Sequence, residues 1–150
     1  LESGNLNDVI EKAVTAFDGR FTRLVIDLEL AEALPEIALD PEQMKRIFVN
    51  LIENSVEAFD GAAEEPRILV TTRYEGARDI IVAEVSDNGK GIAPSDLQKL
   101  FQPYFSTKGR GTGLGLAIVN RIISEHHGRI KVVGNQPKGA KFIIELPVNG

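Results

Sequence analysis

Apolar residues recur every three or four positions in three stretches of the chain and alternate with polar residues in several shorter ones. The helical spacing predicts helices over residues 6–17, 41–59 and 113–127. The alternation predicts strands over residues 20–30, 67–75, 78–87, 129–134 and 141–146. A further short helix is predicted over 95–101. The chain therefore combines about three long helices with at least five strands.

Turn residues divide these elements. Gly76-Ala77 predicts a hairpin between two strands, and residues 135–139 predict a second hairpin. Before the second helix, Asp40 is a capping residue, Pro41 suits the first turn, and Gln43 completes a capping box. These elements predict an α+β fold for a single domain over 1–150, a two-layer sandwich with one mixed sheet and three helices on one face.

The last predicted helix ends with two histidines and a glycine. Gly128 is expected to end the helix, as glycine commonly does at helix C-termini. His126 and His127 lie in the last turn, where the helix dipole favours an imidazole. We therefore interpret both histidines as capping residues and not as phosphoacceptors or metal ligands.

Charge and composition narrow the function. The net charge of −5 argues against nucleic acid or an acidic membrane as the main partner. The chain has no cysteine, which excludes disulfides and zinc–thiolate sites. No apolar run approaches the ~18 residues that cross a bilayer. We expect a cytoplasmic domain without membrane contact. We also expect that the chain, which opens at Leu1, is cut from within a longer protein.

A glycine-rich turn follows the strand that ends at Asp87, with the sequence Asp-Asn-Gly-Lys-Gly-Ile over residues 87–92. A carboxylate at a strand end can accept a hydrogen bond from an exocyclic amine such as adenine N6. Gly89 and Gly91 would let the backbone approach a flat base. An ordinary Asp-Asn-Gly turn explains the same residues equally well.

A second glycine motif opens the last helix, with the sequence Gly-Thr-Gly-Leu-Gly-Leu over residues 111–116. A helix N-terminus with unpaired N–H groups suits phosphate oxygens. The alternative is a flexible hinge before the helix. The motif lacks the Gly-Lys-Ser/Thr ending of a P-loop. Lys108 and Arg110, just before it, could neutralise a terminal phosphate or could be ordinary exposed cations.

Two asparagines, Asn50 and Asn54, share one face of the second predicted helix. Amide oxygens are hard ligands that suit magnesium held between protein and phosphates. By themselves these residues are more typical of a solvated face. They gain significance only if the two glycine motifs lie opposite them.

Together these segments resemble the ATP-binding catalytic domain of bacterial sensor histidine kinases, a superfamily shared with DNA gyrase, the Hsp90 chaperones and MutL. The resemblance covers about residues 6–147. It rests on five motifs: an N box at residues 50–58, a first glycine box at 87–92, an F box at 101–105, a second glycine box at 111–116 and a weaker last glycine box at 139–142. Residues 103–116 are most similar to nitrogen-regulation sensors of the NtrB/NtrY type.

The resemblance implies a Bergerat fold with a mobile ATP lid over about residues 88–112, and it implies ATP and Mg²⁺ as ligands. Asp87 would bind adenine N6, Asn54 would coordinate Mg²⁺, and Asn50 would support metal and phosphates. Ile92 and Phe105 would enclose the base, and Lys108 would reach the terminal phosphate. The remaining contacts would come from Gly89, Gly91, Gly111, Thr112, Gly113, Leu114, Gly115 and Leu116.

Two positions depart from the family pattern. Ala140 stands where the last glycine box often has threonine, so a water-mediated hydroxyl contact to the purine is absent there. Glu57 stands where many members carry a cation three residues after the metal asparagine. This second departure makes Lys108 or Arg110 more important for phosphate charge.

The resemblance implies a protein-histidine kinase that donates the γ-phosphate to a histidine on a separate dimerisation domain, and indirectly to a response regulator. No His-Glu or His-Asp phosphoacceptor box is present, so we expect the chain alone to bind ATP, not to autophosphorylate, and to be monomeric. The parent protein can be anchored in the bacterial inner membrane. An ATP-hydrolysing clamp and a non-enzymatic nucleotide-binding module are the alternatives. The clamp is disfavoured because Asn50 stands where such relatives place a glutamate base.

Overall fold

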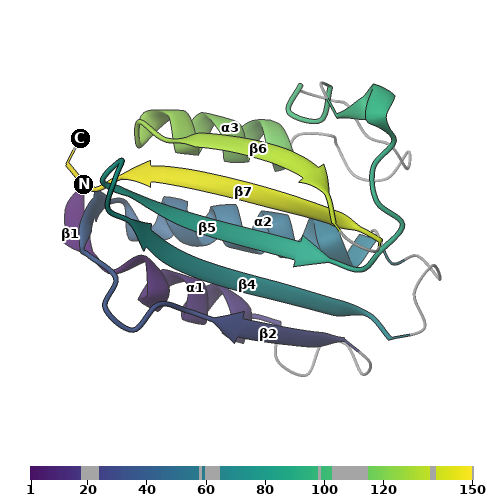
Figure 1. The fold of residues 1–150 in the computed structure, drawn as a ribbon, viewed down its shortest axis with the longest axis horizontal. Coiled ribbons are helices and arrows are strands. Elements are labelled where there is room, and N and C mark those ends of the chain that lie inside the picture. The colour runs from purple at the N-terminus through teal and green to yellow at the C-terminus, as the bar shows by residue number, and fades with distance from the viewer. Residues whose placement is uncertain are drawn as a thin grey trace.

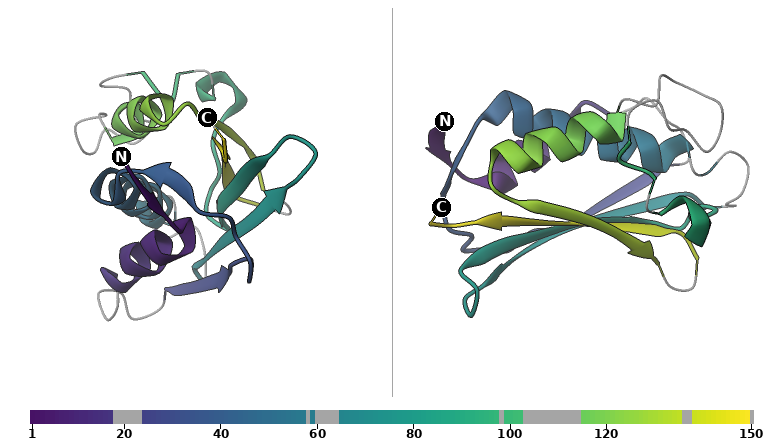
Figure 2. Two further views of the ribbon diagram at one scale, coloured as in Figure 1. Left: turned by 90° about the vertical axis from the view of Figure 1, so that its left-hand side faces the viewer. Right: turned by 90° about the horizontal axis from the view of Figure 1, so that it is seen from above.

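The computed structural model describes residues 1–17, 24–57, 59, 65–97, 99–102, 115–135 and 138–149. The described residues form two layers, a twisted sheet and three helices that cover one of its faces (Figures 1 and 2). The predicted α+β sandwich with a mixed sheet and three helices on one face is confirmed.

The five-stranded sheet runs in the order β2 (Val25–Glu29), β4 (Arg67–Glu75), β5 (Ile80–Asp87), β7 (Ala140–Pro147) and β6 (Arg129–Gly134). β2 lies parallel to β4, and the other neighbours are antiparallel, so the sheet is mixed. Both predicted hairpins are present. Within the predicted strand over 20–30, β2 forms at Val25–Glu29. Residues 18–23 are not among the described residues.

A second sheet was not predicted. β1 (Glu2–Gly4) pairs antiparallel with β3 (Ile37–Leu39), next to the helices and separate from the main sheet. Nothing in the sequence pattern predicted β1. A three-residue polar strand is too short to show alternation, and only its partner across the fold orders it.

The three helices are α1 (Leu6–Thr15), α2 (Pro41–Glu57) and α3 (Gly115–Glu125). The fourth predicted helix, over 95–101, is wrong: η1 (Pro94–Asp96) is a single 3-10 turn, and the described residues up to 101 form turns. Its backbone bonds join residues three apart, as in Lys99 N–H to Asp96 O. An isolated helix this short is marginal without a long apolar face to pack.

The core lies between the helices and the sheet. The sheet-facing side of α2 is completely buried and packs against alternate residues of the central strands. The largest fully buried side chains come from the three helices, from the main sheet and from β3: Phe48, Phe142, Leu6, Ile10, Leu39, Met44, Ile47, Leu51, Ile52, Ile68, Ile81 and Ile122. Burial of this apolar surface is the main force that holds α2 over the sheet.

The start of α2 is capped as predicted, but not by a capping box. Asp40 Oδ1 accepts hydrogen bonds from the N–H groups of Glu42 at 3.1 Å and Gln43 at 3.2 Å. In a capping box the Gln43 side chain would accept from the Asp40 N–H. That N–H instead donates to His126 Nε2 at 3.1 Å, and Gln43 Oε1 is buried with no hydrogen-bond partner. A ring from a distant helix has taken the place of the local partner.

The end of α3 also differs from the prediction in its detail. The left-handed residue is His127, with φ of 62°, and not Gly128. The Gly128 N–H donates to Ile123 O at 2.9 Å and the His127 N–H to Ser124 O at 3.0 Å, the paired bonds of a Schellman ending. Gly128 is required for another reason: a Cβ there would lie 2.4 Å from Glu145 O of β7.

Candidate functional site

The carboxylate of Asp87 lies at the end of β5, where it is 2% exposed. Its Oδ1 accepts hydrogen bonds from the N–H groups of Gly89 at 2.9 Å and Ala140 at 3.3 Å. The side chain of Asn135 donates to the main-chain oxygen of Asp87 at 2.8 Å. Main-chain donors from two separate loops therefore hold this carboxylate in one orientation.

Two glycines allow these loops to meet. Gly139 has φ of +112°, and a Cβ on it would lie 1.9 Å from the main-chain oxygen of Asp87. Gly91 has φ of +79°, and a Cβ on it would lie 3.2 Å from Gly139 O. A side chain at Gly139 would force the β5 end and the β6–β7 turn apart. The first and last glycine boxes thus form one unit around Asp87.

Sequence reasoning missed part of this unit. Asn135 was assigned only to a turn, and Gly139 only to a weak motif. The sequence did contain a signal for a turn, since an asparagine and a glycine stand at the two ends of the predicted hairpin turn. Neither residue type reveals that its partner is the end of β5, because that contact joins residues 48 apart in the sequence.

The two asparagines lie on α2 beside the start of α3. Asn50 Nδ2 donates to Gly115 O at 3.5 Å, which places the N box against the second glycine motif. Asn54 lies one turn further along α2 and is half-buried. Because the nitrogen of Asn50 faces Gly115, its amide oxygen is turned to the other side. Amide oxygens are of the type that Mg²⁺ accepts alongside phosphates and water, so this pair fits the implied metal.

The asparagines and Asp87 share one end of the molecule. The bond from the Asp40 N–H to His126 places the start of α2 beside the end of α3. α3 leads directly into β6, which begins where β7 ends and where β5 begins. The end of α2 consequently lies over the end of β5 (Figure 1). Asn54 is near the end of α2 and Asp87 is the last residue of β5, so both lie at the same edge.

The other predicted site residues divide into two groups. Ile92 and Leu116 are half-buried and pack against the core. Phe101, from the F box, packs edge-to-face against Phe142, with ring centroids 6.5 Å apart. Six predicted contacts lie outside the described residues, as does the C-terminal part of the predicted lid, residues 103–112: Phe105, Lys108, Gly111, Thr112, Gly113 and Leu114.

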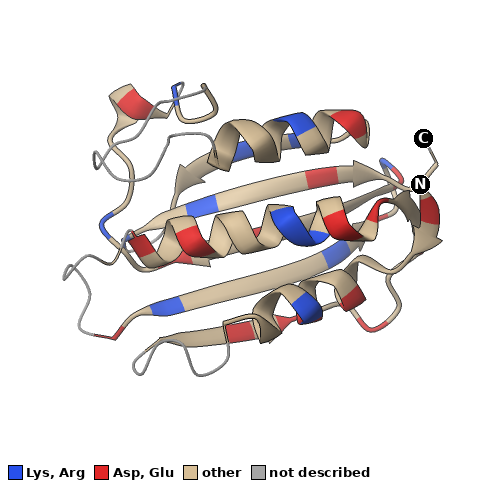
Figure 3. Ribbon diagram, turned by 180° about the vertical axis from the view of Figure 1, so that it is seen from behind, with Lys and Arg blue, Asp and Glu red and all other residues tan. Residues whose placement is uncertain are grey.

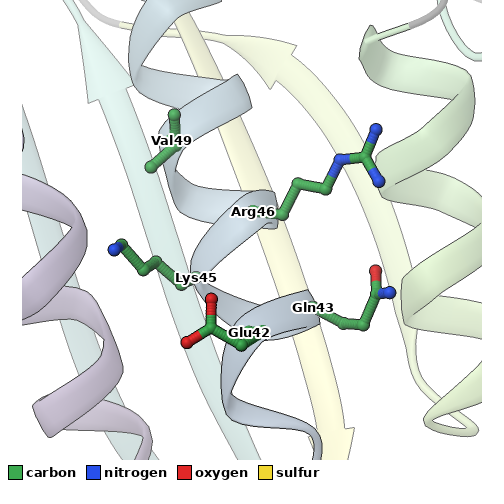
Figure 4. A pocket seen from close by; sticks show the side chains of 5 residues that line it. All are labelled: Glu42, Gln43, Lys45, Arg46 and Val49. Atoms are coloured by element: carbon green, nitrogen blue, oxygen red, sulfur yellow. The ribbon is translucent and has the colours of Figure 1, made fainter.

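A hollow of about 370 Å³ lies at the opposite end of α2, lined by Glu42, Gln43, Lys45, Arg46 and Val49 (Figure 4). Gln43 and Arg46 extend toward α3, while Glu42 and Lys45 extend toward α1 (Figure 4). None of these residues belongs to the predicted site. Across the described ranges, no group of three histidine or acidic residues could hold a metal, and no helix is long and apolar enough to span a membrane.

Comparison with known proteins places the chain in a family. Residues 39–150 match the family described as histidine kinase-, DNA gyrase B- and HSP90-like ATPase. The chain is 39% identical over 150 residues to the sensor histidine kinase ZraS of Salmonella typhi, and 35% identical over 147 residues to the histidine-protein kinase AtoS of Escherichia coli K12. These alignments cover 99% and 97% of the chain but only 31% and 24% of the two relatives.

Solved structures show the same likeness at the level of the fold. The nucleotide-free catalytic domain of histidine kinase ThkA superposes with a TM-score of 0.84 at 30% identity, over 99% of this chain and 97% of that one. Full-length ShkA in complex with AMPPNP superposes with a TM-score of 0.84 at 26% identity, over 98% of this chain and 31% of that one.

A structure of ThkA in complex with the response regulator TrrA superposes with a TM-score of 0.79 at 26% identity, over 99% of this chain and 42% of that one. The family match covers most of the sequence, and the catalytic domain of ThkA is matched along nearly its whole length. The chain therefore belongs to the histidine kinase-, DNA gyrase B- and HSP90-like ATPase family, as the catalytic ATP-binding domain of a sensor histidine kinase.

Proposed function

We propose that this chain binds Mg²⁺-ATP at the end of β5 and α2 and donates the γ-phosphate to a histidine on a separate dimerisation domain. The observation that supports this most directly is the buried carboxylate of Asp87, fixed by the N–H groups of Gly89 and Ala140. A carboxylate fixed in this way is a pre-organised acceptor for the exocyclic amine of adenine. Guanine, with a carbonyl at that position, would be rejected.

The phosphates would lie toward the start of α3. This helix has no acidic residue in its first turn, so its N-terminal N–H groups favour an anion. Mg²⁺, held by Asn54 and supported by Asn50, would neutralise charge on the phosphates. Lys108 would provide a cation near the γ-phosphate. Catalysis by these residues would consist of positioning and charge stabilisation, which is sufficient for phosphoryl transfer.

The solved structures of relatives support the proposed protein partners as well as the proposed nucleotide. ShkA binds AMPPNP, an ATP analogue, and ThkA forms a complex with the response regulator TrrA. We infer that the present chain serves a phosphoacceptor domain directly and a response regulator indirectly. The likeness to nitrogen-regulation sensors of the NtrB/NtrY type rests on residues 103–116 and stays a prediction. The same holds for a cytoplasmic location and a monomeric fragment.

Hydrolysis by the domain alone is the less favoured function. An amide cannot take a proton from water, so Asn50 does not provide the general base that an ATP-driven clamp needs at this position. Its observed bond to Gly115 O instead gives Asn50 a positioning role between α2 and α3. Transfer to an added phosphoacceptor domain, with little phosphate release in its absence, would separate the kinase from the clamp.

Replacing Asp87 with asparagine tests the purine contact cleanly. The variant Asp87→Asn keeps an oxygen for the N–H groups of Gly89 and Ala140, but its amide nitrogen would face the adenine amine as a second donor. We expect affinity for Mg²⁺-ATP to fall by about 1–3 kcal/mol, or roughly 5- to 150-fold. Isothermal titration calorimetry with ATP and GTP measures this.

The matched control is Asp79→Asn, at the hairpin turn where β5 begins, which should leave ATP affinity unchanged. An Asp87→Asn protein that folds normally and binds ATP as tightly as the parent would overturn the purine assignment. It would also remove the main support for the proposed function.

Replacing Asn54 with alanine tests the metal assignment. Because its amide oxygen is the proposed protein ligand of Mg²⁺, Asn54→Ala should make ATP affinity nearly independent of Mg²⁺ concentration. The measurement is a set of ATP titrations at several Mg²⁺ concentrations and in EDTA. Exposed Glu53, its neighbour on α2, provides the control as Glu53→Gln. If Asn54→Ala retained the full magnesium dependence, the ligand would have to be another group.

A further inference from the structure

The hydroxyl of Ser55 is buried without a partner. Ser55 is 0% exposed, and its Oγ forms no hydrogen bond, even to the carbonyl of Leu51 one turn earlier. An unpaired buried hydroxyl costs about 1–3 kcal/mol. The other two buried hydroxyls in the described part of the chain are paired: Thr72 Oγ1 donates to Asn7 Oδ1 at 2.8 Å, and Ser86 Oγ donates to Leu69 O at 3.5 Å.

The helical spacing of α2 shows where this hydroxyl points. Phe48, Leu51 and Ile52 lie seven, four and three residues before Ser55, so all four occupy the same side of the helix. This side faces the sheet, because the three apolar residues are fully buried in the core. Of the strands in the described sheet, β5 lies nearest to α2.

The position along α2 shows which part of β5 lies beneath. Ser55 is two residues before the end of α2, and α2 ends over the end of β5 (Figures 1 and 2). Asp87 is the last residue of β5 and is buried on the helix side of the sheet. At this end of the core, the described buried polar side chains between helix and sheet are those of Ser55 and Asp87.

We propose that Ser55 is a purine-specificity residue, whose hydroxyl bonds to the base edge next to the amine that Asp87 accepts, directly or through one water. This inference rests on the proposed function and adds a residue to it. A purine seated on Asp87 would bring ring nitrogens, which are acceptors, into reach of an otherwise unpaired donor. Ala140, on the other side of Asp87, supplies only a main-chain N–H, which Asp87 already occupies.

Alanine at position 55 separates a binding role from a structural one. Ser55→Ala removes one oxygen and leaves the packing of α2 intact. Without nucleotide, the melting temperature should stay the same or rise by about 2–4 °C, because an unpaired buried hydroxyl has been removed. With nucleotide, the Kd for Mg²⁺-ATP should increase about fivefold, as for loss of one neutral hydrogen bond.

The ligand series locates the contact on the base. ATP and ADP should lose the same factor in Ser55→Ala, while inorganic tripolyphosphate should compete equally well with a bound fluorescent ADP in parent and variant. Ser86→Ala is the matched control: this buried hydroxyl lies next to Asp87 in sequence but on the opposite face of the sheet, and its loss should not change ATP affinity.

Each result decides the question. The proposal is supported if ATP and ADP affinities fall while the melting temperature does not. It is overturned if affinity is unchanged, if tripolyphosphate is weakened as much as ATP, or if affinity and melting temperature fall together. Asp87→Asn separates failure of the Ser55 proposal from failure of the proposed function. If Asp87→Asn abolishes ATP selectivity while Ser55→Ala binds ATP normally, the role of Ser55 fails and the proposed function stands.

Discussion

Two non-glycine residues in the described part of the chain have left-handed backbone conformations. Asp79 has φ of 53° in the turn before β5, and His127 has φ of 62° at the end of α3. Aspartate tolerates this conformation because its short side chain can bond locally; here it accepts from Tyr74 at 2.6 Å. Histidine has no such benefit at a Schellman ending, where glycine is the usual residue. His127 is therefore a position of local strain.

Glycine at position 127 should relieve that strain. We expect His127→Gly to raise the free energy of unfolding by about 0.5–1 kcal/mol, the left-handed penalty less the extra entropy of an unfolded glycine. Urea denaturation followed by circular dichroism measures the change. The side chain of His127 is exposed, so little packing is lost.

The adjacent glycine provides the opposite control. In Gly128→Ala the new Cβ would meet Glu145 O, so this variant should be less stable than the parent. If His127→Gly were destabilised to the same degree, the side chain of His127 would have a stabilising contact that outweighs its backbone conformation.

At the level of elements, His126 joins two helices that are far apart in the sequence. Its Nε2 accepts from the Asp40 N–H, and its Nδ1 lies 2.8 Å from Ile122 O. A ring nitrogen that faces an N–H must act as the acceptor, so the proton is on Nδ1, which donates to the carbonyl. The end of α3 thereby caps the start of α2, and this bond fixes the antiparallel arrangement of the two helices.

Loss of this ring should weaken the α2–α3 junction. His126→Phe keeps the bulk but removes both bonds and leaves the Asp40 N–H without its acceptor. We expect the free energy of unfolding to fall by about 1–3 kcal/mol. Thermal and urea denaturation measure it, with exposed Ser124→Ala as the control in the same turn. A variant as stable as the parent would show that solvent replaces the ring.

At the level of the whole molecule, the two ends of the sheet differ in how their polar groups are satisfied. At the β4–β5 turn, Tyr74 and Asn149 donate to Asp79, and Arg78 bonds to Glu75 and Glu145. The Tyr74 hydroxyl, then Asn149, lowers the pKa of Asp79, while Asp79 raises the pKa of Tyr74. Arg78 lowers the pKa of Glu75. The polar side chains around this turn are therefore bonded to one another.

The opposite end contains a buried hydroxyl that no described residue bonds. Ser55 lacks a partner there, and Asn54 and Asp87 lie at the same edge. Charge does not provide an obvious phosphate site on the helix side, since α2 ends with exposed Glu53 and Glu57 (Figure 3). Local dipoles and a metal would therefore have to bind the anion in a protein whose net charge is −5.

The outer face of the sheet has a structural role. Cross-strand ion pairs cover it, with Arg73 and Lys141 at 3.0 Å and 3.5 Å from the two oxygens of Glu84. A mostly antiparallel sheet such as this one, with one apolar and one charged face, needs only one layer of helices. The described molecule therefore has one core, and the proposed ATP site lies at the edge where that core meets the glycine loops.

The sequence alone determined the three long helices, both hairpins and the helix-covered sheet, because hydrophobic periodicity depends on local geometry. It also indicated Asp87, Asn50 and Asn54, since these residues stand in recognisable local motifs. It could not predict β1, whose order comes from β3, or the 3-10 turn at Pro94–Asp96, where short-range propensity was too weak to decide.

Tertiary structure alone decided which distant groups meet. The ring of His126 displaced Gln43 from the Asp40 N–H, and Gly139 proved necessary because the backbone of Asp87 approaches it. The unpaired hydroxyl of Ser55 became apparent only when α2 was placed over β5. Periodicity shows which face of an element is buried, but hydrogen bonds depend on atoms within about 3 Å, and only the packed chain brings those atoms together.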